Sequence, residues 1–135
     1  MSAAVIELRS VERHYVQGAR KLTILNGADF ALVPGEMVAM VAPSGAGKST
    51  LLHILGMHDS AWTGDYWLGA EPIHQHSTKE RMRLQKQHVG FVFQAFNLIP
   101  TLTALENIRL PSDLAGRDLD PACLDGVIDA VELRD

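Results

Sequence analysis

The residues of this chain best suited to chemistry lie in one short segment, Ala-Pro-Ser-Gly-Ala-Gly-Lys-Ser-Thr at residues 42–50. Glycines followed by a lysine and hydroxyl residues are typical of a phosphate-binding loop, in which backbone N–H groups surround a phosphate and the next helix points its positive end at it. In such a loop Lys48 reaches the β- and γ-phosphates, and the Ser49 hydroxyl ligates Mg²⁺. The residues predicted to bind a nucleotide here are Ser44, Gly45, Ala46, Gly47, Lys48, Ser49 and Thr50.

The first position of this loop departs from the usual pattern, because it holds Ala42 where the pattern has glycine. A methyl group is tolerated there if φ is negative and is harmful if the turn needs a positive φ. A second interpretation of the segment is an ordinary Gly/Ser turn followed by a chance Lys-Ser-Thr. The strand and helix expected on either side favour the phosphate loop, so we expect phosphate binding that is present but weakened.

Two apolar runs are expected to position this loop. Residues 37–42 are apolar at every position, which predicts a strand buried on both faces, as in a parallel sheet. From Lys48 the pattern becomes helical, and Gly56 permits the helix to stop. A second apolar run, residues 89–93, predicts another buried strand that ends at Gln94.

Shorter patterns predict the other elements. Residues 5–8 and 28–32 indicate antiparallel strands, and residues 66–68 indicate a short strand between glycines. Capping signals predict three helix starts, at Ser77, Thr103 and Asp120. Together these patterns predict an α/β fold.

Composition excludes several classes of protein. The chain of 135 residues is 47% apolar and 21% charged, which is ordinary for one globular domain and excludes fibrous or wholly disordered proteins. No apolar stretch approaches the roughly 20 residues of a membrane span, and no secretory signal is expected. The net charge is −4 and the basic cluster at residues 79–86 is short, so we expect no nucleic-acid binding. The single Cys123 fits a reducing, cytoplasmic compartment.

Several phrases of the sequence resemble the ATP-binding subunits of ABC transporters. They are residues 42–52, Gly-Phe-Val-Phe-Gln at 90–94 and Asn-Leu-Ile-Pro at 97–100. Within that superfamily, Pro-Gly-Glu at 34–36 and Leu-Thr-Ala-Leu-Glu-Asn-Ile at 102–108 look most like the lipoprotein-releasing and macrolide-export branch. The resemblance extends over essentially the whole chain.

The resemblance implies a P-loop NTPase fold, that of an ABC ATP-binding domain with an N-terminal antiparallel β portion. It implies an ATPase with ATP and Mg²⁺, whose hydrolysis is coupled to export or lipoprotein release. Lys48 and Gln94 would be catalytic, Ser49 and Gln94 would ligate Mg²⁺, and Gln94 would open the Q-loop at residues 94–100. Tyr15 matches the aromatic residue that stacks on adenine, although a tyrosine at a strand end is equally well explained by packing.

The implied partners are a membrane-spanning transporter subunit and a second ATP-binding subunit, at the cytoplasmic face of the inner (plasma) membrane. We expect the apolar side chains Phe96, Leu98 and Ile99 to contact the membrane subunit. The alternative is that they fold into the domain's own core.

The resemblance also marks motifs that these residues do not contain: the Leu-Ser-Gly-Gly-Gln stretch, an aspartate–glutamate pair after an apolar strand, and the switch histidine. Residues 1–135 therefore look like a single partial ABC ATP-binding domain, truncated at its C-terminal side. Val-Ile-Asp at 127–129 does not replace the acidic strand, because its apolar spacing is helical.

We accordingly expect this chain alone to bind ATP without hydrolysing it. The runs at 37–42 and 89–93 would keep unpaired edges, because in the family the strands between them come from the other half. Two alternatives stand beside the transporter: a truncated remnant or regulatory fragment that binds nucleotide or a membrane partner without turnover, and a P-loop kinase of small molecules. The kinase is disfavoured because its lid needs arginines, and residues 50–80 hold none.

Overall fold

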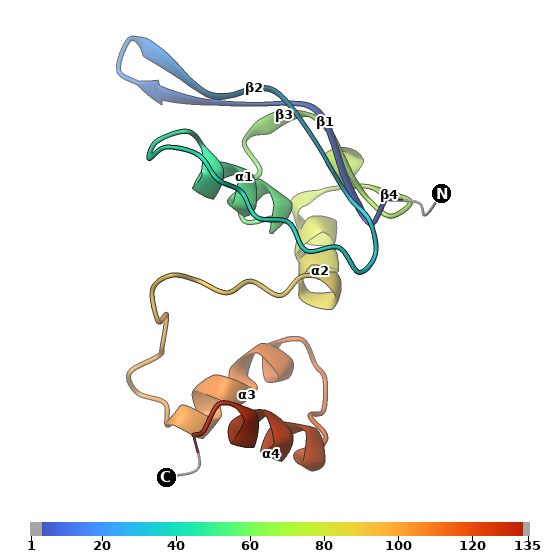
Figure 1. Cartoon of the computed structure of the whole chain (residues 1–135), viewed down its shortest axis with the longest axis vertical. Coiled ribbons are helices and arrows are strands. Elements are labelled where there is room, and N and C mark those ends of the chain that lie inside the picture. Colours follow the sequence, from blue (N-terminus) through green and yellow to red (C-terminus); the bar gives the residue numbers. More distant parts are fainter. Residues whose placement is uncertain (1–3, 134–135) are drawn as a thin grey trace. The chain divides into compact units, whose positions relative to one another are not determined.

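The computed structural model describes residues 4–133 and divides into two compact units, residues 1–91 and 92–135 (Figure 1). The first unit carries the sheet and two helices, α1 and α2. The second carries two further helices, α3 and α4. Each unit is described by itself.

The sheet of the first unit is antiparallel throughout, with the strand order β2-β1-β3-β4. Strands β1 (Ile6–Gln17) and β2 (Arg20–Leu32) form a long hairpin, closed by a turn in which Gly18 has a φ of +62°. Strand β3 (Trp62–Leu68) pairs with the other edge of β1, and β4 (Glu71–Pro72) is short. The predicted antiparallel strands are confirmed, and they are longer than the sequence patterns indicated.

Bulges interrupt this sheet and depend on particular glycines. The register of β1 shifts between Arg9 and Glu12, where Ser10 has a φ of +49°. Gly64 of β3 lies opposite this bulge with a φ of +101°, and a Cβ atom at Gly64 would lie 2.5 Å from the Ser10 carbonyl oxygen. Only glycine fits there, because both the conformation and the space exclude a side chain.

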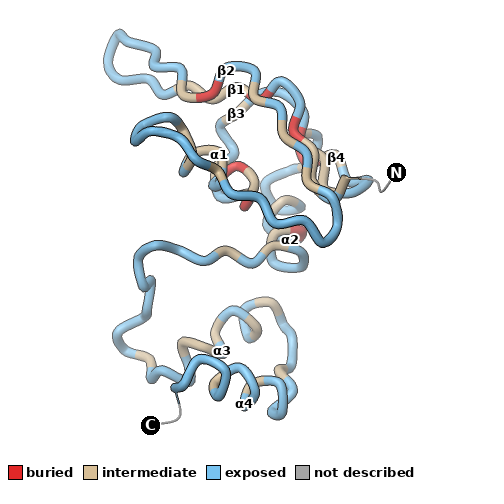
Figure 2. The backbone as a smooth tube through the Cα atoms, in the orientation of Figure 1, coloured by how far each residue is buried: buried red, intermediate tan, exposed pale blue. Residues whose placement is uncertain are grey.

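The core of the first unit lies between the sheet and helices α1 (Lys48–Leu55) and α2 (Thr78–His88). A short 3₁₀ helix, η1 (Ile73–Gln75), contributes to it. Buried positions, red in Figure 2, all belong to this unit. The core side chains are Leu8, Val11, Leu25, Ile54, Tyr66, Ile73 and Leu84.

The second unit consists of α3 (Ala104–Leu114) and α4 (Pro121–Ala130), neither of which has a buried residue. Each helix starts where the sequence predicts. Thr103 and Glu106 form a capping box, and the Asp120 carboxylate accepts a hydrogen bond from the Ala122 N–H at 3.1 Å. Helix α2 likewise starts with a capping box, from Ser77 and Glu80.

Two sequence predictions are wrong. Residues 37–42 and 89–93 are not strands but irregular segments, and Met37, Val41 and Val92 are 97%, 93% and 97% exposed. The sequence pattern shows only that these segments are apolar. A strand also needs an adjacent strand whose backbone accepts hydrogen bonds from its N–H groups and donates them to its C=O groups. Within residues 4–133 no strand pairs with either segment.

Candidate functional site: the start of helix α1

Helix α1 begins within residues 42–50, where the sequence predicts a phosphate loop, and two glycines shape the turn before it. Gly45 and Gly47 have φ values of +81° and +89°, in the left-handed region that favours glycine. Gly47 is also the N-cap residue of α1. A Cβ atom there would lie 3.0 Å from the Cγ2 atom of Ile24, so glycine is needed for close approach as well.

The amino end of α1 differs from those of the other helices. A side chain caps each of α2, α3 and α4, whereas among the described residues no side chain caps α1 and no acidic residue stands in its first turn. The first N–H groups of α1 and its positive dipole end are therefore left for an anion. A pocket of about 430 Å³ lies at this end, lined by Ile24, Ser44, Gly45, Gly47, Lys48, Ser49 and Thr50.

The ammonium group of Lys48 folds back over the loop. Its Nζ atom donates hydrogen bonds to the carbonyl oxygens of Ala42 and Pro43, the second at 2.8 Å. Pro43 O also accepts a hydrogen bond from the Ala46 N–H at 3.2 Å, which closes the turn. The loop thus holds one positive charge beside a set of N–H donors, an arrangement suited to a polyphosphate.

Ala42 is compatible with this loop. Among residues 4–133 the non-glycine residues with a positive φ are Ser10, Met57, Asn97 and Glu132, so Ala42 keeps a negative φ. Its methyl group therefore sits on an ordinary alanine backbone.

The opposite end of α1 is fixed by two side chains from other elements, the buried Tyr66 and the half-buried Gln85. The Tyr66 hydroxyl of β3 donates a hydrogen bond to Leu55 O at 2.7 Å, and the Gln85 amide of α2 donates one to Gly56 O, also at 2.7 Å. Burial raises the pKa of Tyr66, so the hydroxyl stays a donor. Both carbonyls belong to the unpaired last turn of α1, and satisfying them positions the helix relative to the sheet.

A bulge in β2 supplies the site residue that sequence reasoning missed. Arg13 pairs with Leu25 and His14 pairs with Thr23, so Ile24 is an extra residue in β2 with no opposite partner in β1. Bulges redirect side chains, and this one places Ile24 against Gly47 and in the lining of the phosphate pocket. No composition or spacing signal marks it in advance.

The structure places Tyr15 on the hairpin, opposite Leu22 of β2. Tyr15 is 41% exposed, and the guanidinium carbon of Arg13 lies 4.1 Å from the centroid of its ring. Tyr15 is not among the residues that line the phosphate pocket. It lies on the same hairpin as Ile24, which does line it.

Gln94 belongs to the second unit, where it is exposed and lies outside the helices and strands. The loop that it opens is held at its far end by Asn107 of α3. The Asn107 side chain accepts a hydrogen bond from the Ile99 N–H at 2.8 Å and donates one to Ile99 O at 3.2 Å. Phe96 and Leu98 in the same loop are 92% and 64% exposed.

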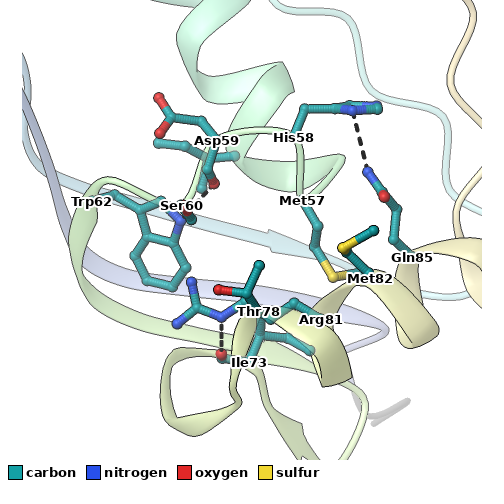
Figure 3. A pocket seen from close by; sticks show the side chains of 11 residues that line it. Met57, His58, Asp59, Ser60, Trp62, Ile73, Thr78, Arg81, Met82 and Gln85 are labelled. Carbon is teal, nitrogen blue, oxygen red and sulfur yellow. Dashed lines mark hydrogen bonds between the residues drawn. The ribbon is translucent and has the colours of Figure 1, made fainter.

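A second pocket, of about 280 Å³, lies between the end of α1, the start of β3 and α2 (Figure 3). Two of its polar side chains bond to nearby backbone. Arg81 Nε donates to Ile73 O at 2.9 Å, and Trp62 Nε1 donates to Asp59 O at 3.0 Å. These bonds support loops of the protein and favour a structural role. Within residues 4–133 no group of three or more His, Cys, Asp or Glu side chains is arranged to hold a metal ion.

Comparisons with known proteins agree with the geometry at α1. A family model described as "ABC transporter" matches residues 25–135. The lipoprotein-releasing system ATP-binding protein LolD of Nitrobacter hamburgensis is 46% identical over 112 residues, which are 83% of this chain and 48% of that protein. The uncharacterized ABC transporter ATP-binding protein YbbA of Escherichia coli is 44% identical over 112 residues, 83% of this chain and 49% of its own length.

Solved structures show the same fold. The dimeric structure of MJ0796, a bacterial ABC transporter cassette, superposes with a TM-score of 0.83 and 32% identity, over 94% of this chain and 56% of that one. A second structure of MJ0796, in a post-hydrolysis state bound to ADP and Pi, has a TM-score of 0.83 and 31% identity, with the same coverage.

The chain spans about half the length of these relatives. No helix within residues 4–133 has both the length and the apolar character that a membrane span requires. The family match covers most of the chain, and the P-loop, the antiparallel sheet and the solved cassettes agree with it. The chain therefore belongs to the ABC transporter family, as an ATP-binding cassette similar to LolD and YbbA.

Proposed function

We propose that this chain binds Mg-ATP at residues 42–50, as part of an ABC ATPase that powers export or lipoprotein release. The observation that carries the proposal is the uncapped start of α1, which opens on a pocket lined by Lys48, Ser49 and Thr50. Free N–H donors, a helix dipole and a lysine suit a triphosphate. The similar MJ0796 cassette bound to ADP and Pi supports the same ligand class.

Each site residue has a proposed role. Lys48 contacts the β- and γ-phosphates, while the N–H groups of residues 44–50 surround the phosphates. The Ser49 hydroxyl, which lines the pocket, would ligate Mg²⁺, and the family resemblance alone implies Gln94 as a further ligand. Tyr15 stacks on the adenine. The metal, when bound, would neutralise charge on the phosphates.

The proposed assembly contains two such cassettes and a membrane-spanning subunit, at the cytoplasmic face of the inner membrane. The dimeric MJ0796 structure and the name of LolD support this assembly. The exposed side chains of Phe96 and Leu98 are the proposed contact with the membrane subunit. We place residues 1–135 in one ATP-binding domain, of which they are a part.

A second candidate function is a remnant or regulatory fragment that binds nucleotide without turnover. One observation favours binding without hydrolysis. Residues 127–129 lie inside helix α4, so they do not form an acidic strand of the kind expected to activate water. Groups that stabilise the transition state are distinct from groups that bind the ground state, so ATP can be held without being cleaved.

The first prediction tests the phosphate loop with Lys48→Ala. We expect the Kd for Mg-ATP, measured by calorimetry, to rise between about tenfold and a hundredfold, because charge-assisted contacts to phosphate are worth roughly 1.5–3 kcal/mol. Ala42→Gly is the matched control in the same loop and should leave Kd within about twofold, since Ala42 needs no positive φ.

Equal dissociation constants for the wild-type chain and Lys48→Ala would refute binding at this loop. Phosphate release is measured beside affinity. Release by the wild-type chain above that of Lys48→Ala would refute binding without turnover and leave the binding site itself intact.

A further inference from the structure

An ion pair between Arg13 of β1 and Asp59, which follows α1, stands apart from the other ion pairs of the described residues. The Arg13 Nε and Asp59 Oδ2 atoms are 2.7 Å apart, and the two side chains are only 13% and 15% exposed. Another arginine–carboxylate pair, Arg9 with Glu7, has side chains that are 60% and 34% exposed. Water therefore screens the Arg13 pair less than the Arg9 pair.

Asp59 makes hydrogen bonds with both its side chain and its backbone. Its Oδ1 atom accepts a hydrogen bond from the Ala61 N–H at 2.8 Å, and its carbonyl oxygen accepts one from Trp62 Nε1 at 3.0 Å. Its own N–H donates to His53 O at 3.1 Å, which ties it to the last turn of α1. Burial alone would raise the pKa of the carboxyl, but the bonds from Arg13 and Ala61 and the charges of Arg13 and His53 outweigh it and lower that pKa.

Arg13 in turn fixes the ring of Tyr15. Its guanidinium carbon lies 4.1 Å from the ring centroid, while Nη1 donates a hydrogen bond to His14 O. The guanidinium thus covers one face of the ring, and Tyr15 is still 41% exposed, which leaves ring surface for a second planar group.

Tyr15 lies on the same hairpin as a residue that lines the phosphate pocket. Tyr15 pairs with Leu22, and Ile24, two residues further along β2, lines the pocket. Asp59 is tied to the carboxyl end of α1, the helix whose start forms the proposed phosphate site, so the ion pair connects this helix to the hairpin that carries Tyr15.

We infer that Arg13 is a positioning residue: anchored by Asp59, it holds the Tyr15 ring in the orientation that stacks on the nucleobase. This inference rests on the proposed function, because it assumes that the phosphates bind at residues 42–50. A purely structural ion pair would support the fold alone and would act on every ligand of the pocket alike.

The test compares two probes, Mg-ATP and Mg-tripolyphosphate, which has no base. In Arg13→Gln we expect the Kd for Mg-ATP to rise about tenfold, the loss of one good stacking contact, while the Kd for tripolyphosphate stays within about twofold. Arg9→Gln is the matched control, because it removes an exposed ion pair in the same strand and should change neither constant. Asp59→Asn should reproduce the ATP-selective effect and serves if Arg13→Gln fails to fold.

A double variant separates positioning from general support. If Arg13 acts through the ring, Arg13→Gln added to Tyr15→Ala should weaken ATP binding no further than Tyr15→Ala alone. Equal weakening of both probes in Arg13→Gln and Asp59→Asn, or additive losses in the double variant, would overturn the inference. So would an unchanged affinity for ATP in Tyr15→Ala. Failure of the proposed function looks different: the wild-type chain would then bind neither probe, or Lys48→Ala would bind both as well as the wild type.

Discussion

Helix α1 of the first unit and the helices of the second unit are stabilised by different means. In the second unit, α3 and α4 begin with strong side-chain caps and contain no buried residue. In the first unit, α1 has no side-chain cap, but Ile54 is fully buried and other elements hold its last carbonyls. Caps depend on neighbours in sequence and burial depends on neighbours in space. The helix that packing fixes is the one whose amino end is left for a ligand.

A similar contrast lies inside the first unit. Residues 37–42 are apolar at every position and largely exposed. Strand β1 contains charged residues among its apolar ones, yet it supplies Leu8 and Val11 to the core. Strand β1 has partners on both edges, β2 and β3. Apolar content alone therefore does not make a buried strand.

The largest effect is expected from Gly64→Ala in the first unit. The new Cβ atom would lie 2.5 Å from Ser10 O, at a φ of +101°, so we expect the free energy of unfolding to fall by about 4 kcal/mol. Both tryptophans of the chain, Trp62 and Trp67, lie in β3 and report this unit by fluorescence during chemical denaturation.

The matched control is Gly116→Ala in the second unit. Gly116 has a φ of +65° but no atom within 4 Å of the added Cβ, so the expected loss is only about 1 kcal/mol. Similar losses for the two variants would show that conformation, and not the packed bulge, makes Gly64 necessary.

A smaller effect should separate the packing of the two units. Ile54→Ala removes a fully buried side chain and should cost about 3 kcal/mol, whereas Ile128→Ala in α4, at a position that is not buried, should cost under about 1 kcal/mol. Thermal and denaturant unfolding measure both. If Ile128→Ala cost as much as Ile54→Ala, the second unit would possess a core of its own, and the contrast would fail.

The smallest effects should be alike in the two units, because caps are local. Ser77→Ala and Thr103→Ala should each lower helix stability by about 1 kcal/mol. The pKa of Glu80 is lowered by hydrogen bonds from the side chain and backbone of Ser77, and that of Glu106 by hydrogen bonds from the backbone and side chain of Thr103.

These shifts give the caps a pH dependence. A carboxyl whose pKa is lowered by folding stabilises the helix above its ordinary pKa, and this contribution disappears as the pH falls through the lowered value, below about pH 4. Circular dichroism should show helix content falling in that pH range, and the fall should be smaller in Ser77→Ala and in Thr103→Ala than in the wild type. An equal fall of helix content in the wild type and in both variants would mean that the capping boxes do not stabilise the ionised carboxylates of Glu80 and Glu106.

Local signals made much of this protein predictable. The phosphate loop, the start of α1 and the three capped helix starts follow from residue types at fixed spacing, because each depends on contacts within four or five residues. Of the site residues expected at 44–50, all but Ala46 line the pocket. Ile24 could not be predicted, since it reaches the pocket through an extra residue in β2 whose effect depends on the register with β1.

The sequence by itself determined where nucleotide chemistry is possible and which family the chain belongs to, because glycine conformation, helix capping and the lysine of the loop are properties of a short stretch of chain. Only the tertiary structure decided which apolar runs are buried, how β2 bulges toward Gly47, and that Arg13 and Asp59 meet across 46 residues beside Tyr15. Those outcomes depend on pairing edges and packing partners that are distant in sequence, and the free energy of burial or of an ion pair exists only once the chain has brought them together.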